Sequence, residues 1–271
     1  MELNVLNMTL LAALGLTAGT LSGLFGIGGG MVIVPGLFYL FGFMGLPEPT
    51  LMHLAAGTSM TIMIFTATSS VLSHHRRENV QWSIFRRILP SVGIGVVLGK
   101  LLANQLNSQW LEGIFGVFLL FVALKLLLDW LPTPEHPEPP QQKWVNLVGT
   151  ILGFKSGVLG IGGGAISVPF LLYSGLSMGQ ASGTSASFTL PIAIVGTVSC
   201  LLLPSPETGV IGTIGTVYWP AVALVAPFTM LGAPIGASLC HIIPQIQLKR
   251  LFALFLLCLG LRLLGGTVAF V

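Results

Sequence analysis

The sequence predicts an all-α polytopic membrane protein with two inverted-topology repeats, each built from a Gly-broken helix pair plus three transmembrane helices. Three observations lead to this fold class. Hydrophobic residues make up 54% of the 271 residues and charged residues only 7%, whereas a soluble domain is about 25% charged. A glycine-rich motif occurs twice, and the basic residues fall in opposite places in the two halves of the chain. The first two observations indicate a duplicated membrane protein, and the third indicates that one copy is inverted.

Residues 22–35 and 156–169 are two copies of one motif, identical at nine of fourteen aligned positions. Each copy contains Gly-Ile-Gly-Gly-Gly inside an apolar segment. A glycine lowers helix preference by about 1 kcal/mol relative to alanine, so each copy predicts a break in a helix. Lipid cannot satisfy the backbone N–H and C=O groups that a break frees, so the break must be buried in protein or line a cavity. Two such breaks, one in each half, point to a transport site.

Apolar segments near the roughly 20 residues that a membrane-spanning helix needs surround both breaks. In the first half, helices are expected near 5–25, 30–43, 51–72, 88–104 and 111–130. In the second half, they are expected near 144–160, 165–174, 182–203, 217–240 and 248–268. No basic residue precedes the first segment, so we interpret it as a retained helix and not as a signal peptide. The proline-rich stretch 132–143 is expected to link an N-terminal transmembrane repeat, 1–131, to a C-terminal repeat, 144–271.

The duplication extends beyond the two breaks. The matched pairs are Gly57-Thr58-Ser59 with Gly183-Thr184-Ser185, Gly95-x-x-x-Gly99 with Gly232-x-x-x-Gly236, and Lys125 with Arg262. Gly-x-x-x-Gly pairs allow two helices to approach closely, so we expect them to serve helix packing and not chemistry. Lys125 and Arg262 are expected to anchor helix ends or to snorkel toward an interface.

The placement of the basic residues predicts the membrane orientation. Arginines at 76, 77, 86 and 87 lie between the third and fourth segments, whereas the counterpart 203–216 has no Lys or Arg. The next connection reverses the contrast, because 104–110 has no basic residue and 241–250 has two. Since basic loops stay in the cytoplasm, the two halves are expected to be inverted. An inverted repeat needs an odd number of crossings, so each broken pair is expected to enter and return, with both termini outside and the linker inside.

A short helix begins after each break and would present its N-terminus to the membrane interior. The partial positive charge and unpaired N–H groups there can bind an anion, and glycines let it come close. We therefore expect a small oxyanion to sit between the two breaks. The candidate substrate-binding residues are Gly28, Gly29, Gly30, Thr58, Ser59, Lys155, Gly162, Gly163, Gly164, Thr184 and Ser185. The alternative is structural: the glycines permit tight helix crossings, and the hydroxyls bond to nearby backbone.

Lys155 lies near the middle of its segment with no acidic residue close in sequence. An ionisable residue at that depth is a functional-site hypothesis. Its counterpart in the first half is Leu21, so the lysine is not part of the shared repeat, and snorkelling is the alternative interpretation. Lys100 and His53 receive no role from the sequence.

These residues resemble the sulfite exporter family of the TauE/SafE type. The resemblance rests on the duplicated Ser-Gly-x-x-Gly-Ile-Gly-Gly-Gly-x-x-x-Val-Pro, the Gly-Thr-Ser that follows each copy and the later Gly-x-x-x-Gly. It covers nearly the whole chain. It implies a permease of the bacterial cell inner membrane that exports sulfite or an organosulfonate such as sulfoacetate. Lys155 is not a hallmark that the resemblance carries over.

Two alternatives stay open at this point. Within transport, the protein could be an anion channel or a carrier for another small oxyanion or carboxylate, and dependence on a proton or sodium gradient would identify a coupled carrier. Outside transport, an intramembrane hydrolase would need a base beside a serine nucleophile. The five histidines are scattered and the three cysteines form no pair, so we predict no catalytic residue, no metal and no cofactor. The expected partners are the anion and the lipid bilayer, with no nucleic acid, and the apolar exterior suits a monomer and a homodimer equally.

Overall fold

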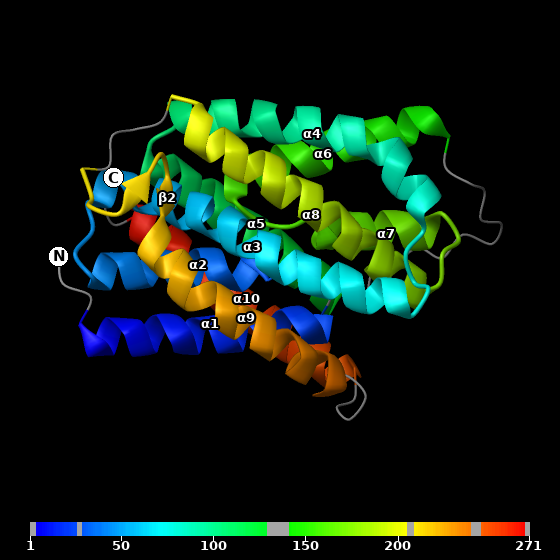
Figure 1. Cartoon of the computed structure of the whole chain (residues 1–271), viewed down its shortest axis with the longest axis horizontal. Coiled ribbons are helices and arrows are strands. Elements are labelled where there is room, and N and C mark those ends of the chain that lie inside the picture. Colours follow the sequence, from blue (N-terminus) through cyan, green and yellow to red (C-terminus); the bar gives the residue numbers. More distant parts are fainter. Residues whose placement is uncertain (1–3, 26–28, 129–140, 205–208, 240–244, 269–271) are drawn as a thin grey trace.

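The computed structural model describes residues 4–25, 29–128, 141–204, 209–239 and 245–268, and nearly all of them are helical. Figure 1 shows the helices as a bundle whose members lie roughly along one common axis. The α-helices are α1 (Val5–Phe25), α2 (Gly30–Phe43), α3 (Leu51–Arg76), α4 (Trp82–Gln105), α5 (Ser108–Leu127), α6 (Gln142–Leu159), α7 (Gly164–Tyr173), α8 (Met178–Leu202), α9 (Trp219–Leu239) and α10 (Gln245–Val268). The shorter elements are the 3-10 helix η1 (Glu48–Thr50) and the strands β1 (Thr213–Ile214) and β2 (Val217–Tyr218).

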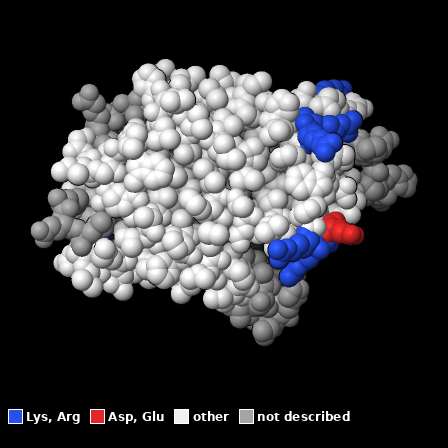
Figure 2. Space-filling view, viewed as in Figure 1, with Lys and Arg blue, Asp and Glu red and all other residues white. Residues whose placement is uncertain are grey.

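Within the described ranges, six helical segments are long and apolar enough to cross a membrane, and α2 and α7 are shorter apolar helices. Large apolar side chains such as Phe121 and Leu231 are more than half exposed on the outside of the bundle, as a lipid-facing surface requires. Figure 2 shows a face that is uncharged over most of its length, with Lys and Arg gathered at the end where α3 leads into α4. The predicted all-α, multi-pass membrane fold is confirmed.

Some predicted boundaries differ from the structure at the ends of the bundle. Helix α4 begins at Trp82, six residues before the predicted start, so Arg86 and Arg87 lie in the helix and not in a loop. Helix α6 begins at Gln142, so the last two residues of the predicted linker are helical, and 132–140 lie outside the described residues. Arginine and glutamine are good helix formers, so a helix can continue past the apolar stretch that marks it in the sequence. The short β1–β2 hairpin between α8 and α9 was not predicted.

Equivalent helices of the two halves form equivalent contacts. Helix α3 packs on α8 and α5 on α10, while α1 packs along α9 and α6 along α4. The first helix of each half thus lies against a helix of the other half, so the described helices of the two halves interlock. Figure 1 shows α3 and α8 running in opposite directions, as do α4 and α9.

The inverted orientation in the membrane can be tested by labelling two exposed positions. We expect Ile211→Cys, between α8 and α9, to react with an impermeant maleimide in intact cells, because its connection lacks Lys and Arg. Glu78→Cys, beside the arginines that follow α3, should react only after the membrane is permeabilised. The exposed Cys258 would first be replaced by serine. Labelling of both positions from one side would contradict the inversion.

Glycines allow close crossings of α4 with α6 and of α9 with α1. A Cβ atom on Gly95 of α4 would collide with Thr150 O of α6, and one on Gly99 with Phe154 O. In the equivalent crossing, a Cβ on Gly232 of α9 would lie 2.5 Å from Leu16 O of α1. The predicted packing role of both Gly-x-x-x-Gly pairs is therefore confirmed.

We expect Gly95→Ala to destabilise the protein, because the α6 backbone cannot move away from the added methyl group. Overpacking of this kind costs about 1–3 kcal/mol. Gly93→Ala is the matched control on the same helix, since a Cβ there would meet nothing within 4 Å, and it should be neutral or stabilising by up to about 1 kcal/mol. Thermal unfolding of both variants in detergent micelles measures the difference, and equal melting temperatures would contradict it.

Candidate substrate site at the glycine breaks

The second break is tightly packed against α3. Gly160 ends α6 in the left-handed conformation, with φ 71°, which favours glycine. A Cβ atom at this position would lie 2.5 Å from Ala56 Cα. Helix α7 then begins at Gly164, after Ile161, Gly162 and Gly163. The break thus brings the start of a half-helix to the middle of the bundle.

The first break meets the second. Gly29, with φ 73°, precedes the first residue of α2, Gly30, and Gly28 lies outside the described residues. A Cβ atom on Gly30 would lie 2.9 Å from Ile161 Cα and 3.3 Å from Gly160 O. The two glycine runs, 134 residues apart in sequence, are therefore in direct backbone contact.

The start of α7 offers backbone donors. The N–H groups of Ile166 and Ser167 donate to Gly163 O. Within the described residues, no hydrogen bond is seen for the N–H groups of Gly164 and Ala165. Free N–H groups of a first helical turn carry partial positive charge, so this helix end is suited to an anion.

A pair of serines lies beside the second break, with Ser167 in the first turn of α7 and Ser185 in α8. The Oγ atoms of Ser167 and Ser185 are 2.6 Å apart, and Ser167 Oγ donates to Gly163 O at 3.0 Å. Both side chains are fully buried. In the first half, position 33 is isoleucine, and the buried Ser59 Oγ has no partner within the described part of the chain. The sequence did not identify Ser167, because the counterpart residue is apolar and the position is absent from the repeated pattern.

The two threonines of the Gly-Thr-Ser motifs make reciprocal contacts between the halves. Thr58 Oγ1 accepts a hydrogen bond from Tyr218 N at 3.0 Å, and Thr184 Oγ1 accepts one from Gln81 N at 2.9 Å. Each threonine thus holds the connection between two helices of the other half. Direct contact of Thr58 or Thr184 with a substrate stays a prediction.

Lys155 reaches across the second break. Its Nζ donates to Gly162 O at 2.8 Å and lies 5.1 Å from the centroid of the Phe118 ring. The ammonium group therefore binds one of the carbonyl groups that the break frees, and Leu21, its counterpart, cannot do so. No ion pair of Lys155 is formed within the described residues, so the Gly162 carbonyl and the Phe118 ring are the groups seen to stabilise its ammonium group.

Lys125 adds a second cation at the same place. Its Nζ donates to Ala165 O, in the first turn of α7, at 3.4 Å. The counterpart Arg262 instead lies over the Tyr39 ring, 4.7 Å from its centroid. The sequence suggested helix-end anchoring or snorkelling for both residues, and in the structure the half-buried Lys125 donates to the backbone of α7. Two lysine ammonium groups, those of Lys125 and Lys155, therefore converge on the second break.

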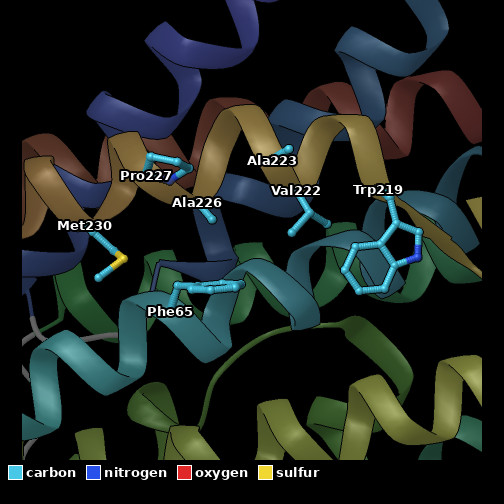
Figure 3. Close-up of a pocket in the computed structure, with 7 residues that line it drawn as sticks. All are labelled: Phe65, Trp219, Val222, Ala223, Ala226, Pro227 and Met230. Atoms are coloured by element: carbon cyan, nitrogen blue, oxygen red, sulfur yellow. The ribbon is translucent and has the colours of Figure 1, made fainter. Parts of the chain in front are cut away.

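A separate groove lies between α3 and α9 (Figure 3). It has a volume of about 390 Å³ and is lined by Phe65, Trp219, Val222, Ala223, Ala226, Pro227 and Met230. No candidate substrate-binding residue lines it. An apolar groove of this kind cannot stabilise a small anion.

The described residues also bear on the hydrolase alternative. A Gly-x-Ser-x-Gly pattern occurs at 175–179, but its serine, Ser177, is the N-cap of α8, and its Oγ accepts a hydrogen bond from Gln180 N at 3.3 Å. This serine is exposed at a helix end and acts in a capping box, which stabilises the helix. Within the described ranges, no group of three or more His, Cys, Asp or Glu residues could hold a metal ion.

Sequence comparisons with known proteins cover nearly the whole chain. The family described as "Sulfite exporter TauE/SafE" matches residues 11–263. A "Probable membrane transporter protein" of Haemophilus influenzae is 32% identical over 254 residues, which cover 92% of this chain and 95% of that protein. A protein of the same description from Methanocaldococcus jannaschii is 28% identical over 271 residues, covering 96% of each chain. The probable membrane transporter protein YunE of Bacillus subtilis is 26% identical over 278 residues, covering 96% and 98%.

Proposed function

The chain belongs to the sulfite exporter TauE/SafE family of membrane transporters, and from this premise we propose that it exports a small sulfur oxyanion, sulfite or an organosulfonate. The transported anion binds where the two glycine breaks meet. Its charge is balanced there by helix ends, hydroxyl groups and lysine ammonium groups.

The contact between the two breaks is the observation that supports this proposal most directly. Gly30 of one half lies against Ile161 of the other, so an anion at this contact is reached by both halves at once. A sulfite or sulfonate group has three oxygen atoms that accept hydrogen bonds. The free N–H groups at the start of α7 and the Lys155 ammonium group are donors of the kind that such oxygens need. The hydroxyls of Ser167 and Ser185 would exchange a present hydrogen bond for one to the anion.

The same contact supports an alternating mechanism. Each break joins a long helix to a half-helix, and the halves meet at glycines that have no side chains to interlock. Because the halves interlock, the movement is assigned to the helices on either side of the two breaks: a shift of these helices would open the anion to one side of the membrane and then to the other, as expected for transporters with broken helices.

Uptake into liposomes that contain the purified protein tests the proposal. We expect saturable sulfite uptake that depends on an imposed proton or sodium gradient. Sulfate and acetate should inhibit this uptake only weakly. Uptake without gradient dependence would indicate a channel. Well-folded protein that moves neither sulfite nor methanesulfonate but does move acetate would replace the proposed substrate with a carboxylate.

A further inference from the structure

Lys100 is a buried cation that the proposed site does not use. It lies near the end of α4 with 2% of its surface exposed. Its Nζ donates to Thr216 Oγ1, in the β1–β2 hairpin, at 3.2 Å. None of the acidic residues within the described ranges, which are Glu48, Glu78 and Glu112, forms an ion pair with it. An unpaired charge inside a membrane-spanning bundle is costly, so it points to a function.

His53 of α3 lies on the same side of α4. Its Nε2 is 3.1 Å from Ala103 O, and Ala103 follows Lys100 by one helical turn, so the two residues share a face. A carbonyl can only accept a hydrogen bond, so Nε2 carries the hydrogen and the neutral ring has a bare Nδ1. That Nδ1 is buried and has no hydrogen-bond partner within the described part of the chain.

The equivalent positions in the second half of the chain hold neither a histidine nor a lysine. The counterparts of His53 and Lys100 are Gly179 and Ala237, by alignment of the repeated motifs. The hairpin residue Thr216, which faces Gly57, corresponds to Asn79, which faces Gly183. The same helix packing therefore forms without a cation or a histidine, so the fold does not require this pair.

The pair lies close to the second glycine break. A Cβ atom on Gly157 of α6 would lie 2.9 Å from Lys100 N, and Gly157 precedes the break by one turn. On α3, Ala56 follows His53 by one turn and contacts Gly160. Lys100 and His53 therefore lie about one helical turn from the second break.

We propose that Lys100 and His53 form a second anion subsite, one helical turn from the second break, at which a sulfonate or sulfite binds together with one proton. The choice of anion rests on the proposed function. The Lys100 ammonium group donates to the anion oxygens. The bare Nδ1 of neutral His53 repels them, whereas an Nδ1–H group, formed when the ring takes up a proton, donates to them.

Other titratable groups belong to the elements packed around His53. They are Arg86, Arg87 and Lys100 of α4, Tyr218 of β2, Tyr39 of α2, Glu48 of η1, and Glu112 and Lys125 of α5. Lys100 supplies the cation of the subsite, and within the described residues no hydrogen bond joins Glu112 to His53. The proton that accompanies the anion is therefore assigned to His53.

Equilibrium dialysis of the purified full-length protein against labelled methanesulfonate tests this subsite, because methanesulfonate does not titrate near neutral pH. We expect the wild type to bind two anions per chain at mildly acidic pH, and Lys100→Met to bind one. Lys100→Arg should keep both. His53→Gln should lose the pH dependence of the second anion, together with the proton uptake that a weakly buffered solution reports.

Two control variants separate anion binding from helix packing. Thr216→Val removes the hydrogen-bond partner of Lys100 but keeps the cation, so it should bind like the wild type. Lys143→Met removes a positive charge from the exposed first turn of α6 and should also bind like the wild type. The subsite is refuted if Lys100→Met keeps the stoichiometry and pH dependence of the wild type, or if the wild type binds a single anion. Binding of two anions without any uptake into liposomes would refute the proposed function and leave the subsite standing.

Discussion

Lys155→Met is expected to weaken anion binding at the glycine breaks by about ten- to a hundredfold, while the protein still inserts into the membrane. A hydrogen bond to a charged group contributes about 1.5–3 kcal/mol, which corresponds to that range. Lys155 Nζ lies at the break on Gly162 O, 2.8 Å away, so a small movement of the ammonium group reaches an anion at the start of α7. Methionine keeps most of the length and the apolar character of the stem, and it removes the charged ammonium group together with its hydrogen-bond donors.

The comparison with Lys125→Met makes this test specific. Lys125 also donates to the backbone of the second break, to Ala165 O, but over the longer distance of 3.4 Å. We expect its loss to weaken sulfite binding less than the loss of Lys155. Sulfite affinity measured by equilibrium dialysis, with the melting temperature measured beside it, separates the roles. If Lys155→Met lowers the melting temperature without changing the affinity, the lysine only caps the break.

The sequence was informative about the helices for a physical reason. Membrane-spanning helices are long apolar segments ended by polar or helix-breaking residues, and both signals are local. The bounds of α2 were predicted correctly because a glycine run precedes it and Gly45, Leu46 and Pro47 follow it. The interlocking of the halves was not predicted. Gly232-x-x-x-Gly236 indicates that another helix approaches α9 closely, but no local pattern identifies that helix as α1.

The candidate site was only partly accessible to sequence reasoning. The duplicated glycines marked the two breaks, and the structure brings them into contact. Comparing the two copies, however, favours residues that occur in both. Ser167 stands opposite Ile33, and Lys100 stands opposite Ala237, so both were passed over or left without a role. A transport site that is charged on one side only will be missed by a search for symmetric pairs.

Gly160→Ala is expected to abolish most of the transport activity, because the added methyl group disfavours the left-handed backbone and also collides with α3. Left-handed backbone costs a residue with a Cβ about 1–2 kcal/mol. The added Cβ would also lie 2.5 Å from Ala56 Cα and 2.7 Å from Ala56 O, and overpacking costs about 1–3 kcal/mol more. The break can relieve the collision only by moving away from α3, which would separate it from Gly30 and the first half of the site.

Gly209→Ala isolates the first of these costs. Gly209 also has a positive φ, 60°, but a Cβ atom there would meet nothing within 4 Å. We expect this variant to lose about 1 kcal/mol of stability and to keep full sulfite uptake per folded molecule. The second variant to compare is Gly160→Ala combined with Ala56→Gly. Because the collision involves the Ala56 backbone as well as its side chain, the second substitution should restore little activity. The prediction is contradicted if Gly160→Ala and Gly209→Ala have equal melting temperatures and equal sulfite uptake. In that case the second break has room to move, and transport does not need the close contact of the two glycine runs.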